Sequence, residues 1–332
     1  GLVGSEMCIR DSFVDTDLMP ANTWPASYNP QLAYFGYPGL MAPLPLDSIS
    51  VKYVTNEPNI KTTLDGTRWA FSAARTGAPR REWTCALTAP ESVAYGIVDQ
   101  FHQLFGAASS KKLGGWQFLP PFAGRNAMTW DESTLTHLDT YNGDFSMGSQ
   151  GRRQVYQVFD SATYRQRTEK TVNEYVKIAH RVPVFPGSQV KICGWWGDNP
   201  NIRLTFYNQY GNETMQTNPF VPNRDQLAGM DWRESNPYTV KQTNEVAMDV
   251  YMSLRPDYQM LEPRVVIAPF DDATILQPTD PTLRETAVRG SRALSAVISD
   301  INITPQWYPT HHNTHSVGEP IHEVTFKIIE LG

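Results

Sequence analysis

Residues 79–131 read PRREWTCALTAPESVAYGIVDQFHQLFGAASSKKLGGWQFLPPFAGRNAMTWD and contain the clearest strand–helix–strand pattern in the chain. The first strand is marked by alternation, because Trp83, Cys85 and Leu87 fall on one face and more polar residues on the other. The second strand, residues 116–119, is short and apolar and follows two glycines. The stretch carries no acid–base pair, nucleophile motif or phosphate-binding loop, so it is typical of assembly rather than catalysis.

A helix over residues 89–105 is predicted between these strands. Thr88 and Glu91 have the spacing of a capping box, in which two side chains bond backbone N–H groups at the start of a helix. The apolar residues that follow recur every three or four positions and so form one stripe: Val93, Ile97, Phe101, Leu104 and Phe105. We expect this stripe to pack on a sheet that contains Trp83 and Trp116.

The composition favours a mainly β protein. The chain has 332 residues, which is enough for two domains, and its 25 prolines and 22 glycines suit many turns between short strands. The formal net charge is −6 and lysine and arginine do not cluster, which argues against a nucleic-acid partner. No apolar stretch approaches the ~18 residues of a membrane-spanning helix, so we expect no membrane span.

The first twelve residues, GLVGSEMCIRDS, resemble a translated sequencing adapter and are set aside as a non-native scar. A signal peptide is the competing interpretation, but the segment lacks a basic start and a long apolar run. Cys85 and Cys193 are then the remaining cysteines. We expect them to be buried free thiols, because each lies in an apolar, β-like run and the two are far apart in separate modules.

Beyond this scar, the chain divides into three parts. Residues 13–46 are rich in proline and aromatic residues without a sustained period, which predicts an extended arm over another surface. Residues 47–141 form a compact β module with the helix 89–105. Residues 142–332 predict a β-sandwich of jelly-roll type, because many short strands alternate with turns. The strands expected there are residues 154–159, 175–184, 189–196, 202–208, 246–254, 264–269, 293–303 and 323–331.

Two resemblances follow from these motifs. PRREW (79–83), TAPES (88–92) and WQFLPPFAGRNAMTW (116–130) resemble the N-terminal part of minor tail proteins of tailed bacteriophages. VPVFPG (182–187), VKICGWW (190–196) and IRLTFYNQYGN (202–212) resemble carbohydrate-binding-like jelly rolls. The resemblance implies a non-enzymatic structural protein of the virion tail, a minor or distal tail component without a cofactor. Its partners would be other tail proteins and copies of itself.

A glycan-binding module of a secreted or surface protein is the alternative. Trp195 and Trp196 are consecutive on a predicted strand, so one of them faces outward and offers a flat ring to a sugar. The other candidates for contact with a host cell-surface glycan are Tyr207, Asn208, Tyr210 and Trp232. These aromatic residues equally suit a core or a subunit contact, where tryptophan and tyrosine are enriched.

Metal-binding patterns are weak. Three histidines lie within five residues, with a fourth and a glutamate nearby: His311, His312, His315, His322 and Glu319. We expect a solvated loop there. Asp271, Asp272 and Asp280 have the chemistry of a calcium site, but an acidic turn is the preferred interpretation. No metal and no catalytic residue is therefore predicted, although a glycan-processing enzyme stays open as a third class.

Overall fold

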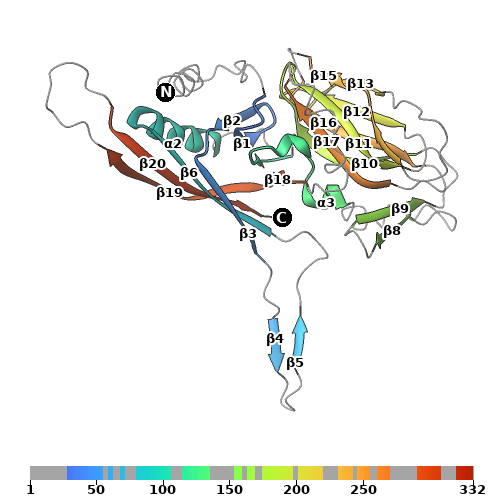
Figure 1. Cartoon of the computed structure of the whole chain (residues 1–332), viewed down its shortest axis with the longest axis horizontal. Helices are drawn as coiled ribbons and strands as arrows, with labels where there is room; N and C mark the ends of the chain where they lie inside the picture. Colours follow the sequence, from blue (N-terminus) through green and yellow to red (C-terminus); the bar gives the residue numbers. More distant parts are fainter. Residues whose placement is uncertain are drawn as a thin grey trace.

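The computed structural model describes residues 28–54, 59–62, 68–71, 80–105, 114–134, 153–158, 163–168, 174–196, 201–219, 231–241, 245–254, 260–269, 290–307 and 319–331. Within these ranges the protein is mainly β, as predicted, and its strands pair antiparallel in several sheets (Figure 1). Both cysteines are buried free thiols, which confirms that prediction, and burial raises the pKa of each thiol to about 12.

The first sheet has the order β19-β20-β6-β3. Its strands are β19 (Ala296–Trp307), β20 (Ile321–Glu330), β6 (Arg80–Pro90) and β3 (Ser48–Val54). The predicted alternation is confirmed, because Trp83, Cys85 and Leu87 are buried on one face of β6. The opposite face of β6 carries residues such as Glu82 and Thr84, which are partly or fully exposed.

Helix α2 (Glu91–Phe105) packs against the buried face of this sheet (Figure 1). Phe101 is fully buried and its ring centroid lies 5.3 Å from that of Phe326 and 6.0 Å from that of Phe35. Val93 and Ile97 are buried with it, so this part of the predicted stripe is confirmed. The side chains of Leu104 and Phe105 lie outside the described residues.

The predicted capping box at the start of α2 is wrong. Strand β6 continues to Pro90, and Thr88 pairs with Glu323 of β20 instead of ending the strand. The helix therefore begins at Glu91, whose backbone N–H donates to the carbonyl of Pro320 at 2.9 Å. Pairing with a distant strand overrides the local helix signal.

A second sheet, in the order β18-β7-β1-β2, lies between two cores. Its strands are β18 (Ala293–Leu294), β7 (Gln117–Leu119), β1 (Ala33–Tyr37) and β2 (Leu40–Leu44). Phe35 faces the core that contains α2, whereas Tyr34 packs on Phe185 of the sandwich at 4.7 Å between ring centroids. Gly36 is required where the hairpin closes, because a Cβ there would lie 2.0 Å from the carbonyl oxygen of Leu40.

The predicted arm is therefore corrected for residues 28–46. Residues 33–44 form a hairpin, and the aromatic side chains of Tyr28, Tyr34 and Phe35 are buried within the same chain. Alternate residues of one strand enter two different cores, so the segment shows no single apolar face along the sequence. Residues 13–27 lie outside the described part of the chain.

The second module is a β-sandwich, as predicted. One sheet contains β10 (Glu174–Pro183), β16 (Ala247–Leu254), β12 (Ile202–Tyr207) and β13 (Glu213–Thr217) in that order. The other has β11 (Gln189–Trp196) paired with β14 (Asp231–Glu234), β15 (Tyr238–Thr239) and β17 (Met260–Ala268). Apolar side chains such as Phe206, Val250 and Ile267 fill the core between them.

Smaller elements complete the description. The hairpin β4 (Asn59–Thr62) and β5 (Arg68–Phe71) lies away from the rest of the molecule, beyond the end of β3 (Figure 1). A second hairpin joins β8 (Arg153–Val158) to β9 (Thr163–Thr168). A 3₁₀ turn, η2 (Ala123–Arg125), and the short helix α3 (Trp130–Thr134) precede the sandwich in the chain.

The strand pairing corrects the predicted boundary at residue 142. Strand β18 pairs with β7, and β20 pairs with β6 along nine successive positions, from Ile321 opposite Pro90 to Ile329 opposite Glu82. The last three strands thus belong to the sheets of the first module, although the sequence assigned them to the second. The sandwich is inserted between the two halves of the first module.

Candidate functional site

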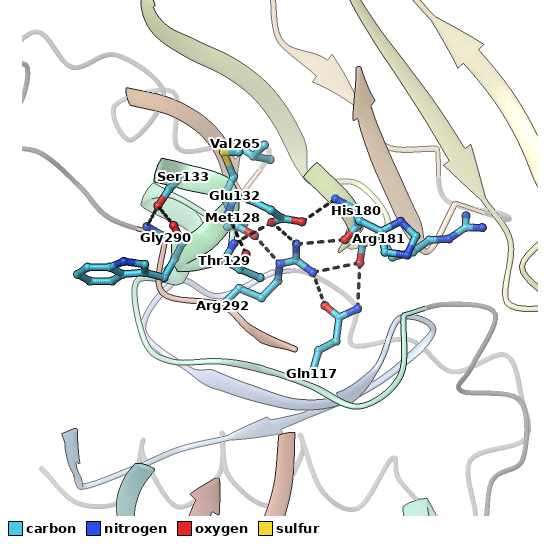
Figure 2. A network of polar contacts seen from close by, with 12 residues as sticks. Gln117, Met128, Thr129, Glu132, Ser133, His180, Arg181, Val265, Gly290 and Arg292 are labelled. Atoms are coloured by element: carbon cyan, nitrogen blue, oxygen red, sulfur yellow. Dashed lines mark hydrogen bonds and ion pairs between the residues drawn. The ribbon is translucent and has the colours of Figure 1, made fainter. Parts of the chain in front are cut away.

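The junction between the modules is built around Arg292, which follows the sandwich in the chain and is fully buried (Figure 2). Its Nη2 donates to Glu132 Oε2 at 2.6 Å, and its Nη1 donates to Gln117 Oε1 at 2.8 Å. The remaining donors reach three backbone carbonyls, those of Ala127, His180 and Arg181. All five N–H donors of the guanidinium thus have acceptors, and these come from both modules.

Glu132 is positioned for this contact by helix α3. Its Oε2 accepts the backbone N–H of Thr129 at 2.8 Å, while Thr129 Oγ1 accepts the N–H of Glu132 at 3.2 Å. This reciprocal pair is a capping box, at the spacing that the sequence wrongly suggested for Thr88 and Glu91. The second carboxylate oxygen accepts the N–H of His180 in β10 at 2.7 Å (Figure 2). One carboxylate therefore joins α3, Arg292 and the sandwich.

A second buried arginine extends the junction into the first sheet. Arg81 makes two hydrogen bonds to the carboxylate of Glu330, at 2.8 and 2.9 Å. Its other donors reach the carbonyls of Gly290, Ser291 and Arg292. The segment that carries Arg292 is therefore held by Arg81 of the first sheet, by Glu132 of α3 and by the backbone carbonyls of His180 and Arg181 in the sandwich. Such a network fixes the two modules relative to one another.

On the sandwich side the network ends at Asp249, whose side chain is fully buried. Lys177 Nζ lies 2.7 Å from its Oδ2, and the backbone N–H of Arg181 donates to its Oδ1 at 2.7 Å. Burial by itself raises the pKa of Asp249, but hydrogen bonds from His180 and Lys177 outweigh it and hold the pKa well below its usual range. Arg181 adopts a left-handed backbone, φ 47°, between these contacts.

We expect Asp249→Asn to destabilise the protein by about 1–3 kcal/mol at neutral pH, because charged hydrogen bonds are lost in a buried site. Since the folded pKa of Asp249 is depressed, this contribution is fully present above the ordinary aspartate pKa and decreases as the pH falls from there towards the lower folded pKa. Urea unfolding of wild type and variant at pH 7 and pH 3 measures the difference, which should shrink at pH 3. Asp300→Asn, at an exposed residue, is the control; a pH-independent difference would contradict the assignment.

The edge strand β3 is the second feature of interest. In the described residues it pairs with β6 alone, and none of its side chains is buried. Val51 lies opposite Trp83 and Ile49 lies opposite Cys85, so these residues continue the apolar face of β6 beyond the helix. The exposed fractions are 36% for Ile49, 44% for Val51 and 49% for Tyr53. The result is an apolar row beside an open backbone edge.

The other edge of this sheet is guarded. Strand β19 carries two irregularities in register, between Ser299 and Asn302 and between Pro305 and Trp307, and a positive φ at Asp300. Bulges, prolines and charges on an edge strand prevent pairing with other chains. Strand β3 pairs with β6 in unbroken register and has one charged side chain, Lys52. Among the described residues, β3 is therefore the edge of this sheet without protective features.

The proposed sugar-contact residues do not gather in one place. Tyr207 is buried, donates its hydroxyl to Asp249 Oδ2 at 3.2 Å and has the Arg181 guanidinium carbon 3.3 Å from its ring centroid. Asn208 Oδ1 accepts the N–H groups of Tyr210 and Asn212, so it stabilises the turn after β12. Tyr210 is exposed, at 65%, on that turn.

The tryptophans belong to the other sheet of the sandwich. Trp195 lies opposite Trp232 in the pairing of β11 with β14, and Trp196 lies opposite Asp231. Their side chains lie outside the described residues, so glycan stacking on them stays a prediction. His311, His312, His315, Asp271, Asp272 and Asp280 also lie outside. The part of the chain that is described contains no cluster of three metal-ligating side chains and no helix that could span a membrane.

Sequence reasoning missed the arginine network. The Thr129-x-x-Glu132 pattern was available as a second capping-box signal, and it would have placed α3. Arg81 and Arg292 gave no comparable signal, because an arginine on an alternating strand or in a loop is ordinarily solvated. Their partners lie more than a hundred residues away along the chain.

Comparison with known proteins gives little. No family model matches the chain, and no curated protein matches it. The enzymatically active domain of bacteriophage CBA120 tailspike protein 4 aligns with a TM-score of 0.26 and 10% identity, over 35% of this chain and 18% of that protein. The infectious bursal disease virus VP2 subviral particle aligns with a TM-score of 0.25 and 7% identity, over 96% and 86% of the two chains. The chain thus spans under a fifth of the tailspike domain, and similarities of this size carry no argument about fold or function.

Proposed function

We propose that this protein is a structural component of a virion, a minor or distal protein of a phage tail that assembles through its first module. The observation that supports this most directly is the open edge strand β3 with its apolar row. Proteins guard exposed strand edges against association, and an unguarded edge with apolar side chains is typical of an interface. The sequence resemblance of residues 79–130 to minor tail proteins agrees with this role.

The junction suits the same role. A subunit of an assembled particle has to present its second module in a fixed direction. Two buried arginines with all donors satisfied, Arg81 and Arg292, hold the sandwich against the first module. In our proposal the first module builds a ring of identical copies, and the sandwich projects from it.

The partner of β3 in this proposal is a second copy of the chain. A contact between one edge of a subunit and a different surface of the next repeats around a closed ring. In such a ring Ile49, Val51 and Tyr53 would be covered by the neighbouring first module. Partners of other kinds in the tail would then bind the faces of the ring.

We expect Val51→Glu to weaken self-association at least about tenfold, because a charge would be buried in an apolar contact. Light scattering coupled to gel filtration at tens of micromolar measures the mass, and negative-stain images of the wild type should show rings. Ser50→Glu is the matched control, since Ser50 is exposed on the opposite face of the same strand.

The melting temperature of Val51→Glu should stay near that of the wild type, because the side chain is 44% exposed in the single chain. A wild-type protein that stays monomeric would overturn the proposal. An unchanged mass for Val51→Glu would remove β3 from the interface.

A further inference from the structure

The outer face of the sheet β10-β16-β12 carries two arginines, Arg203 and Arg181, with buried nitrogens that have no acceptor among the described residues. The guanidinium carbon of Arg203 lies 4.4 Å from the ring centroid of Tyr175 and 4.5 Å from that of Tyr251. Within the described part of the protein this guanidinium makes no hydrogen bond or ion pair, and its Nε is buried without an acceptor. Two tyrosine rings thus hold a charged group that has no counterion among the residues described by the structure.

Arg181 repeats this arrangement two rows along the same face. Its guanidinium stacks on Tyr207, and its Nε and Nη1 are buried with no acceptor among the residues that the structure describes. Thr205 lies between Arg203 and Tyr207 on β12, and its buried hydroxyl is likewise unpartnered. Alternate residues of a strand are spaced by roughly 7 Å, so these groups form one continuous row of unused polar atoms.

The arginines of the outer face differ from the two arginines of the junction between the modules. Arg81 and Arg292 each have a carboxylate partner and acceptors for every donor. On the outer face the carboxylate of Asp249 is buried, and Lys177, His180 and the backbone of Arg181 already bind it. Burying donors without acceptors costs free energy, and native proteins rarely leave them so unless a ligand completes the site.

We propose that this face binds an acidic polysaccharide, with Arg203 and Arg181 each receiving a sugar carboxylate. A guanidinium presents its donors as a planar fork that matches a carboxylate, and stacking on tyrosine fixes the fork before the ligand arrives. Tyr175 is 36% exposed beside Arg203 and offers a ring edge and a hydroxyl to the sugar. Thr205 adds a hydroxyl of its own to the same row.

The overall charge of the protein favours a ligand with widely spaced carboxylates over a ligand with densely spaced negative charges. The net charge is −6, so a nucleic acid would be repelled at long range, and only local contacts could attract an anion. A polysaccharide with one carboxylate on each sugar suits two arginines on one strip of sheet. This site differs from the tryptophans of β11 and β14, which lie in the other sheet.

The experiment titrates polygalacturonate into the full-length protein by calorimetry, with the methyl-esterified chain as the uncharged comparison. We expect the wild type to bind the carboxylated chain and not to bind the methyl-esterified chain. Arg203→Gln should bind at least about tenfold more weakly, as expected for a lost charged hydrogen bond. Arg203→Lys keeps the charge but loses the fork, so it should also bind more weakly. Arg125→Gln is the control, because this exposed arginine stacks on Phe122 elsewhere.

Several results would overturn the proposal. These are no binding of polygalacturonate at millimolar sugar, equal binding of the ester, or wild-type affinity in both Arg203 variants. Equal affinity for polyglutamate would assign the face to an acidic peptide instead. Circular dichroism establishes that each variant is folded, and Arg203→Lys supplies the test if Arg203→Gln does not fold. Val51→Glu should retain binding, so failure of the assembly proposal is distinguishable from failure of this one.

Discussion

Replacing Arg292 with alanine is expected to lower the free energy of unfolding by about 3–5 kcal/mol, because the carboxylate of Glu132 is left buried without its charge partner. Arg292 is fully buried and donates to acceptors from both modules. Its loss should also uncouple the modules. Calorimetry of the wild type should therefore show one unfolding transition, and the variant should show two.

The control for this variant is Arg125→Ala, which removes an exposed arginine that precedes the sandwich. It should change the free energy of unfolding by less than about 1 kcal/mol. Urea denaturation monitored by tryptophan fluorescence gives the free energies. A single transition at the wild-type temperature in Arg292→Ala would show that the apolar cores alone hold the modules together.

Phe101→Ala is expected to destabilise the protein by about 3–5 kcal/mol, the usual cost of removing a buried phenylalanine ring. Phe101 is fully buried between Phe35 of the second sheet and Phe326 of the first sheet. The cavity would open at the centre of the first module, where three elements meet. The same urea denaturation measures the loss.

Tyr95→Ala is the matched control for Phe101→Ala, because Tyr95 is on the same helix and is 51% exposed. Its cost should stay below about 1 kcal/mol. Equal costs for the two substitutions would mean that helix α2 is not anchored through its buried stripe.

Local patterns were enough to predict most strands and the helix. The alternation of β6 and the stripe of α2 are periodic over eight or more residues, and a period of that length specifies which face is buried. The turn after β12 was also predictable, because Asn208 and Gly211 have the side chain and the backbone freedom that a tight turn needs. The buried thiols followed from apolar surroundings in the sequence.

Such local patterns could not predict which strands pair with one another. The sequence of residues 321–330 does not indicate that they pair with β6, and the two strands are separated by more than two hundred residues. Both modules expose the same kind of alternating strand, so the sequence could not choose between them. That choice depends on which apolar faces meet in the folded chain, and it moved the last strands into the first module.

The candidate site was decided by tertiary structure for the same reason. The sequence predicted aromatic residues as the candidate binding site, because consecutive tryptophans on a predicted strand can be recognised without knowing the fold. The hydrogen bonds of Arg81 and Arg292, and the buried Arg203 nitrogen that has no acceptor among the described residues, depend on which groups folding brings close. Local periodicity determines which side chains face inward. Whether a buried arginine has a carboxylate partner is determined by long-range packing, because the partner comes from a distant part of the chain.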